Sequence, residues 1–400
     1  MNVTQVERTN RSSIQPFKVA FPESDLADLH RRLKDVRLPE RETVTDFSQG
    51  TPLATVQKLV KYWANDYDWR VGEKKLSTVP NFITEIDGLD IHFIHVRSKH
   101  QGALPVLIAH GWPGSIMEQL KLIEPLTDPV KFGGTPADAF DVVIPSMPGY
   151  GFSGVPDAVG WNPPRIARAY GELMKRLGYE RYVAQGGDWG AIVVDQMGVQ
   201  APEGLVAIHT NMPCVVPPEI DAVALAGGQV PAGLSTEEEQ AFRQLSAFYK
   251  DVYYAFFMGT RPQTLTGLSD SPVGLATFMI DHDRRSLELI ARSFDGVPEG
   301  ITRDDVLDNI TLFWLTNTGV SAARLYWENK LPFFQPKGVA LPVVASAFPD
   351  ELFQAPESWT RRAYPNLVRY TRLPKGGHFA AWEQPQHLYT EMREGLRSFH

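Results

Sequence analysis

The stretch AQGGDWGA, residues 184–191, decides the fold class of this 400-residue chain. The run RYVAQ before it predicts a strand, and the run AIVVDQMGVQ after it predicts a helix. Small residues at the turn let the strand and the helix pack closely, which leaves Asp188 at a strained tip. A turn of this shape presents a nucleophile, usually serine, in one large class of α/β proteins. Asp188 is therefore a candidate nucleophile, although a glycine-rich turn can also use an aspartate only to cap its helix.

On either side of this turn, short apolar runs alternate with helical patterns between residues 81 and 212. The strand-like runs include PVLIAHG, FDVVIPS and GLVAIHT, and Asp87-Gly88 predicts a hairpin turn before them. Strand-like runs return at LPVVASAF and NLVRYTRL, ahead of a last helix over residues 385–399. Apolar strands that are each followed by a helix indicate a mainly parallel sheet with helices on both faces, an α/β fold.

Two other parts of the chain have helical patterns only. Residues 213–336 contain several, one of them running from 235 to 257 and starting with the capping box of Ser235 and Glu238. A helical block inserted into an α/β sheet predicts a cap, or lid, over the strand ends. We therefore divide the chain into an N-terminal helical extension (1–80), a first part of the core (81–212), the cap (213–336) and a second part of the core (337–400).

The N-terminal extension begins with a polar tail over residues 1–13, which we expect to be frayed. After the tail, the sequence predicts a first helix from Ser24, as the N-cap, until Pro39 stops it. A second helix is predicted over 51–69, with Thr51 as the N-cap and a proline at the first helical position.

Composition and charge exclude several classes of function. The formal net charge is −8, which argues against a broad surface for nucleic acid. The single cysteine, Cys214, excludes an internal disulfide framework and a cysteine-based zinc site. His92 and His95 are three apart on a predicted strand, so they face opposite sides and cannot hold one metal ion. Since the phosphate-binding motif GxxxxGK does not occur, we expect no nucleotide cofactor. We also expect no metal.

The start of the chain predicts no export or anchoring. It has no apolar segment of the kind found in secretory signals, and no run in the chain approaches the roughly 18 apolar residues of a spanning helix. We therefore expect a soluble protein without a membrane anchor, located in the cytoplasm.

Two further motifs lie where the expected sheet would bring them beside Asp188. The loop HGWPG, residues 110–114, follows the strand PVLIA, and such a loop supplies one backbone N–H to an oxyanion hole. The N–H after the nucleophile supplies the other, so the two donors would be those of Trp112 and Trp189. The side chain of His110 is expected to act only as a hydrogen-bonding group of this loop.

The third motif is KGGHFAAWE, which places His378 between the last strand-like run and the final helix. In this fold the order along the chain is nucleophile, acid, histidine, so a carboxylate is expected before His378 at a late strand end. The stretch VVASAFPDELF offers both Asp350 and Glu351. The spacing alone leaves these two alternatives open.

An aspartate at the nucleophile position restricts the electrophile. A carboxylate that attacks a saturated carbon forms an ester, which water can hydrolyse, whereas a serine would form a stable ether. The substrate would therefore be an epoxide or an alkyl halide. A histidine would activate the water for the second step, and the oxyanion donors would stabilise the charge on the ester carbonyl.

The leaving group separates these two chemistries. An epoxide oxygen leaves as an alkoxide and needs a proton donor, for which tyrosines of a cap are suitable. A halide needs only a weak donor such as a tryptophan N–H. The predicted cap contains Tyr249, Tyr253, Tyr254 and Tyr326, which favours an epoxide over a haloalkane-type dehalogenase. A third hypothesis, a binding protein that kept the fold, is disfavoured because all the catalytic motifs are present.

Several motifs, in order, are specific to one family. They are HGWPGS, PSMPGYGFS, GGDWGA, TRPQTL, SDSPVGLA, SAFPDEL and GGHFAAWEQP, preceded by IQPFKVAFPESDLADLHRRLKDVRLPE and YWANDYDWR. From about residue 14 to its end, the chain resembles the microsomal-type epoxide hydrolases of the α/β-hydrolase superfamily. This resemblance implies the α/β-hydrolase fold with a helical cap and an N-terminal extension that wraps around core and cap.

The resemblance also implies a role for each matching residue. Asp188 would be the nucleophile, His378 the base and Glu351 the acid that supports it, while Tyr254 and Tyr326 would protonate the epoxide oxygen. The stretch YYAFFMG departs from the family pattern, so Tyr253 remains an alternative to Tyr254. The side chains expected to line the substrate pocket are those of Trp112, Trp189, Tyr253 and Phe257.

The same resemblance suggests the partners. They are a small epoxide and water, with no cofactor and no nucleic acid, and a homodimer is common in the family. The family includes membrane-bound detoxifying enzymes, insect juvenile-hormone enzymes and soluble microbial enzymes, some of which serve secondary metabolism. This chain resembles the soluble microbial group.

Overall fold

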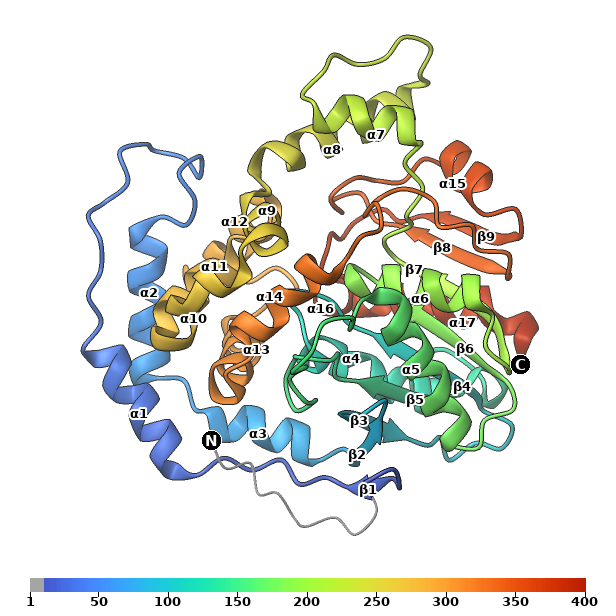
Figure 1. Cartoon of the computed structure of the whole chain (residues 1–400), viewed down its shortest axis with the longest axis horizontal. Helices are drawn as coiled ribbons and strands as arrows, with labels where there is room; N and C mark the ends of the chain where they lie inside the picture. The colour runs from blue at the N-terminus through green and yellow to red at the C-terminus, as the bar shows by residue number, and fades with distance from the viewer. Residues whose placement is uncertain (1–10) are drawn as a thin grey trace.

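The computed structural model describes residues 11–400, so the first ten residues of the predicted polar tail lie outside the described residues. Within the described part, the chain forms one nine-stranded sheet in the order β1-β2-β3-β5-β4-β6-β7-β8-β9 (Figure 1). The strands β1, β2, β3 and β5 pair antiparallel, and those from β5 to β9 pair parallel, which confirms the predicted mainly parallel sheet. The strands are β1 (Gln15–Pro16), β2 (Asn81–Ile86), β3 (Leu89–Val96), β4 (Leu104–Ala109), β5 (Phe140–Pro145), β6 (Tyr182–Gly186), β7 (Leu205–Thr210), β8 (Val343–Ala347) and β9 (Leu367–Arg372).

The predicted hairpin joins β2 and β3. Its two central residues, Asp87 and Gly88, have φ of 54° and 81°. Two consecutive residues in the left-handed region match the right-handed twist of the flanking strands, which is why Asp-Gly favours this turn. The prediction from these two residues is confirmed.

Helices cover both faces of the sheet. On one face α5 and α6 pack against each other, and on the other α4 packs against α16 and α17. Every residue from 189 to 198 in α6 is buried, which explains why apolar residues occur on all sides of this helix. The core helices are α4 (Ile116–Thr127), α5 (Pro163–Arg176), α6 (Trp189–Gln200), α15 (Glu357–Ala363), α16 (Ala380–Glu383) and α17 (Pro385–Leu396), with 3-10 turns at Pro129–Phe132, Pro136–Asp138 and Arg397–Phe399.

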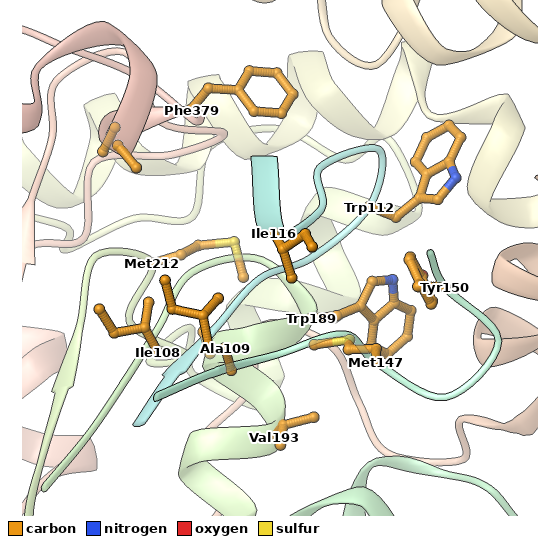
Figure 2. Close-up of a cluster of buried hydrophobic side chains, with 14 of the residues drawn as sticks. Ile108, Ala109, Trp112, Ile116, Met147, Tyr150, Trp189, Val193, Met212 and Phe379 are labelled. Carbon is orange, nitrogen blue, oxygen red and sulfur yellow. The ribbon is translucent and has the colours of Figure 1, made fainter. Parts of the chain in front are cut away.

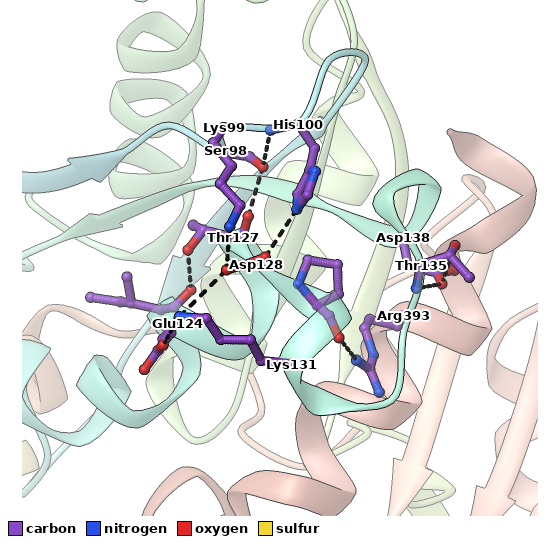
Figure 3. A network of polar contacts seen from close by, with 12 residues as sticks. Ser98, Lys99, His100, Glu124, Thr127, Asp128, Lys131, Thr135, Asp138 and Arg393 are labelled. Carbon is purple, nitrogen blue, oxygen red and sulfur yellow. Dashed lines mark hydrogen bonds and ion pairs between the residues drawn. The ribbon is translucent and has the colours of Figure 1, made fainter.

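A polar network closes the end of the sheet where β4 begins (Figure 3). Asp128, which follows α4, accepts hydrogen bonds from Lys99 Nζ at 2.6 Å and from His100 Nε2 at 3.0 Å. Ser98 Oγ donates to the Thr127 carbonyl at 2.7 Å. These contacts fix the end of α4 to the loop before β4, and the opposite, carboxyl end of β4 leads to the HGWPG loop.

The chain between β7 and β8, all of it described, forms helices and no strand of the sheet. The helix predicted over 235–257 is wrong in one respect, because it breaks at Val252, whose ψ of 32° is not helical. The helix restarts with Tyr254 and Met258, four residues apart, on its buried face. The capping box of Ser235 and Glu238 is confirmed. The helices are α7 (Pro218–Leu225), α8 (Thr236–Asp251), α9 (Tyr253–Thr260), α10 (Gly267–Asp270), α11 (Pro272–Ile280), α12 (Arg284–Phe294), α13 (Arg303–Thr316) and α14 (Gly319–Glu328), with a 3-10 turn at Pro262–Thr266.

The N-terminal region forms three helices where the sequence predicts two. They are α1 (Glu23–Lys34), α2 (Leu53–Asn65) and α3 (Trp69–Ser77). The predicted N-caps are wrong by one or two residues, since Pro22 and Pro52 occupy the cap positions instead of Ser24 and Thr51. The third helix was not predicted, because the stretch DYDW was read as the end of the second helix. In the structure this stretch separates two helices, and the Asp68 side chain caps the second of them by accepting from the Arg70 N–H.

These N-terminal helices lie along the outer side of the cap (Figure 1). Trp63 Nε1 donates to Thr311 Oγ1 at 3.1 Å, and Tyr67 Oη donates to Asp308 Oδ1 at 2.7 Å. The buried Asp308 carboxylate also pairs with Lys75 at 2.6 Å. The extension therefore fixes the cap above the carboxyl ends of the strands. No helix among residues 11–400 is long and apolar enough to cross a membrane.

Candidate active site

Asp188 lies at the tip of the turn between β6 and α6, in a strained conformation. Its φ of 51° and ψ of −129° are sparsely populated for any residue other than glycine. The neighbouring glycines leave room for this turn. A Cβ at Gly186 would lie 2.2 Å from the Gly190 oxygen, and one at Gly190 would lie 2.1 Å from the Ala109 oxygen. The small residues of the motif are therefore a steric requirement of the turn that exposes Asp188.

The HGWPG loop covers Asp188 from the end of β4. The Trp112 N–H donates to Asp188 Oδ1 at 2.7 Å, and a Cβ at Gly111 would collide with the same oxygen. Figure 2 shows the side chains of Trp112, on this loop, and of Trp189 in the cluster of buried side chains around it. Trp189 is the first residue of α6, where a backbone N–H has no partner within the helix. Its N–H stays a predicted second donor.

His110, in the same loop, is structural. Its Nδ1 faces the Gly111 carbonyl at 3.1 Å, and its Nε2 accepts from the Met147 N–H at 3.1 Å. Burial lowers the pKa of His110 to about 4, so the ring stays neutral. This arrangement agrees with the absence of a catalytic role for its side chain.

His378 follows β9 and faces Asp188 from the other side. Its Nε2 lies 3.6 Å from Asp188 Oδ2, and its Nδ1 lies 2.6 Å from Glu351 Oε1. Glu351 Oε1 also accepts from the Leu352 N–H at 2.8 Å, and its side chain is buried. The neighbouring Asp350 points outward instead, toward Arg285 at 3.5 Å. The structure thus brings together the three residues expected as nucleophile, base and acid, whose roles stay predictions.

The two carboxylates control the charge of His378. Burial alone lowers the pKa of His378, but Glu351 and Asp188 outweigh it and raise the pKa to about 10. The imidazole is therefore protonated near neutral pH. When Asp188 loses its charge, one of the groups that raise this pKa is removed.

Two cap tyrosines face the tryptophans beside Asp188. Tyr254 stacks on Trp112 with ring centroids 4.9 Å apart, and Tyr326 meets Trp189 edge-on at 4.7 Å. The two tyrosine rings are 6.1 Å apart. Burial is the main cause that raises the pKa of each hydroxyl well above 10, so both stay protonated and can donate.

The other tyrosines of the cap do not face the site. Tyr253 is 75% exposed and Phe257 is 41% exposed, so their predicted place in the substrate pocket does not fit this structure. The break at Val252 sets the face of α9, and both residues fall on its solvent side. Tyr249 donates to Asp221 Oδ1 at 2.5 Å within the cap.

Glu118, which sequence reasoning missed, borders a small cavity beside the catalytic groups. The cavity has a volume of about 10 Å³, the space of one water molecule, and it is lined by Asp188, His378 and Glu118 among others. A Cβ at Gly114 would lie 2.2 Å from Glu118 Oε2, so the glycine leaves room for this carboxylate. Burial raises the pKa of Glu118 to about 8. The signal in the sequence was the spacing of four residues between Gly114 and Glu118, which lies in the first turn of α4.

His282, also missed, lies between α11 and α12 and is 2% exposed. Its ring stacks on that of His378 with centroids 4.3 Å apart and planes 24° apart. One ligand atom each of Asp188, His282 and His378 lie within 4.8 Å of one another, a spacing that could hold a metal ion. Such an ion would be bound by Asp188 and His378, the residues expected as nucleophile and base. The signal, DHD after a helix, is too common to identify a site.

Comparisons with known proteins show the family of this chain. Residues 14–119 match the family model described as the epoxide hydrolase N terminus, and residues 105–266 match that of the alpha/beta hydrolase fold. A protein of Stigmatella aurantiaca, named as a candidate epoxide hydrolase, is 48% identical over 96% of this chain and 85% of its own length. Epoxide hydrolase 1 of Oryctolagus cuniculus is 35% identical over 94% and 87% of the two chains.

A solved structure is similar over nearly the whole chain. The juvenile hormone epoxide hydrolase of the silkworm Bombyx mori has a TM-score of 0.86 and 29% identity, and the match covers 98% of this chain and 96% of that one. These similarities do not favour the predicted alternative of a dehalogenase.

Proposed function

We propose a two-step mechanism for this chain, which belongs to the epoxide hydrolases with an α/β-hydrolase fold and acts on epoxides. In the first step, Oδ2 of Asp188 attacks a ring carbon of the epoxide while Oδ1 stays bonded to the Trp112 N–H. The ring C–O bond breaks and its electron pair moves to the oxygen. Tyr254 or Tyr326 protonates this oxygen. The product is an alkyl ester of Asp188.

In the second step, water hydrolyses the ester. His378 Nε2 takes a proton from the water, whose oxygen attacks Cγ of Asp188, and Glu351 stabilises the imidazolium. The bond from Cγ to the diol oxygen then breaks, the diol oxygen takes the second proton of the water, and Asp188 returns to a carboxylate that contains the oxygen of the water. The charge that develops on Oδ1 is stabilised by the Trp112 N–H, an interaction worth about 3 kcal/mol in comparable sites. We assign this water to the cavity beside Glu118, because that cavity also adjoins Asp188 and His378.

The observation that carries this proposal is the set of contacts around one carboxylate. Asp188 has one oxygen on a backbone donor at 2.7 Å and the other at 3.6 Å from His378, so it can act as nucleophile with a base beside it. A helix cap would need no histidine–glutamate pair facing it.

A single turnover in heavy-oxygen water tests the ester. With enzyme in excess over styrene oxide, the first diol should contain no label, and the Asp188 peptide should gain heavy oxygen. Later turnovers should release labelled diol. Label in the first diol would rule out the covalent mechanism, while the absence of any diol would rule out the function.

The substrate we propose is a xenobiotic or secondary-metabolite epoxide with an apolar substituent. Aromatic rings surround the site, since Trp112 contacts Tyr254, Tyr326 and Phe278. The homodimer, predicted from the resemblance, and the cytoplasmic location, predicted from the sequence, both stay predictions.

A further inference from the structure

A second histidine–carboxylate pair lies at the site, formed by His282 and Asp283 of the cap. His282 Nδ1 is 2.9 Å from Asp283 Oδ2, while its Nε2 is buried and has no hydrogen-bond partner among the described residues. Asp283 also accepts from the Ser286 N–H at the start of α12. A buried nitrogen without a hydrogen-bond partner lowers the stability of the fold. Its presence at this position therefore calls for a functional explanation.

The ring of His282 lies between the groups of the two chemical steps. Its centroid is 4.3 Å from that of His378 in the core and 5.2 Å from that of Tyr254 in the cap. Ligand atoms of His282, His378 and Asp188 lie within 4.8 Å of one another. One water molecule bridges such a separation, because two hydrogen bonds of about 2.8 Å each span it.

After the first step of the proposed mechanism, His378 still holds a proton that it must lose before the second step. In the resting enzyme, the Asp188 anion helps to keep His378 protonated. Ester formation removes that anion and takes a proton from a tyrosine, which becomes a phenolate. The core then holds an imidazolium and the cap holds a phenolate. His378 must lose its proton before it can act as the base for water.

We propose that His282 transfers this proton from His378 to the phenolate of Tyr254 between ester formation and ester hydrolysis. The N–H bond at His378 breaks, Nε2 of His282 binds the proton through one water, and the phenolate oxygen then takes it. The step leaves a neutral His378 and a restored tyrosine, and hydrolysis returns the enzyme to its resting charges. This proposal rests on the proposed function.

Asp283 supplies the charge that such a transfer needs. Burial acts to raise the pKa of Asp283, but its hydrogen bond with His282 and the neighbouring histidines outweigh this and lower the pKa to about 2. The carboxylate is therefore an anion that stabilises a transiently charged His282. Other titratable groups near this ring are His378 and Asp188 from the core, Tyr254 from α9, and Asp281, the preceding residue, which interacts with it electrostatically.

The substitution His282→Ala tests the transfer with the full-length protein and styrene oxide. Rapid quenching separates the two steps by following the ester on the Asp188 peptide. We expect the rate of ester formation to stay within about twofold and that of ester hydrolysis to fall about tenfold, because the proton must leave through solvent. The rate of hydrolysis should recover at higher pH, where hydroxide removes the proton from His378 directly.

Small-molecule rescue distinguishes proton transfer from packing. Imidazole should restore hydrolysis in the His282→Ala enzyme, whereas pyrazole, which has the same shape but is not protonated near neutral pH, should not. Phe379→Leu is the matched control, because Phe379 contacts the rings of both histidines and carries no proton. Imidazole should have no effect on that variant.

Three results would overturn the proposal. They are unchanged ester hydrolysis in His282→Ala, equal rescue by pyrazole, and a loss confined to ester formation. If His282→Ala does not fold, Asp283→Asn replaces it, since asparagine also caps a helix but removes the counter-charge, and hydrolysis should again be the slower step. A wild-type protein that forms diol without any ester would reject the covalent mechanism instead, and one that forms no diol would reject the proposed function.

Discussion

The two histidine–carboxylate pairs have the same chemistry but are built differently. In the core pair, His378 and Glu351 come from loops after two neighbouring strands, and their atoms approach to 2.6 Å. In the cap pair, His282 and Asp283 are adjacent in the chain and approach to 2.9 Å. Strand ends orient the core pair toward Asp188, whereas the cap pair depends on how the cap sits on the core. We infer that the core pair performs the chemistry and the cap pair supports it.

The largest expected effect follows from removing the core histidine. His378→Gln should slow ester hydrolysis about a thousandfold and leave ester formation measurable, so that the ester accumulates on Asp188. His282→Ala should cause about a hundredth of that effect. Mass spectrometry of the trapped Asp188 peptide measures both. Equal losses in the two variants would contradict the distinction between the pairs.

The acid of the core pair should have the next largest effect. Glu351→Gln should slow ester hydrolysis about a hundredfold, because the imidazolium that forms in this step loses its counter-charge. Asp350→Asn is the control and should stay within about twofold, since its side chain pairs with Arg285 at the surface. A larger loss in Asp350→Asn than in Glu351→Gln, measured in the same single-turnover assay, would mean that Glu351 is not the acid.

The cap tyrosines should have the smallest effect of the three. Tyr254→Phe and Tyr326→Phe should each slow ester formation about tenfold, because the other hydroxyl can still donate. Tyr253→Phe should change it less than about twofold, since that side chain is in solvent. Stopped-flow fluorescence of the tryptophans beside Asp188 follows this step. A larger loss in Tyr253→Phe would mean that α9 is turned differently in solution.

The prediction of the site from sequence was uneven, and the reason is physical. The proximity of Asp188, His378 and the Trp112 loop could be predicted because each follows a strand in a fixed order, and parallel strands bring their carboxyl ends to one edge. Glu351 and Asp350 are adjacent, so spacing cannot separate them; the family resemblance favoured Glu351, and the side-chain directions in the structure agree with that choice. The same holds for Tyr253 and Tyr254, where the break at Val252 sets the helix face.

The sequence by itself determined the α/β class, the inserted cap and the kind of electrophile. These follow from local patterns and from the chemistry of a carboxylate at position 188. Only the tertiary structure placed His282 against His378 and Glu118 against the small cavity. Such contacts join segments that are far apart in the sequence through packing, and no periodicity or motif in the chain records which faces will meet.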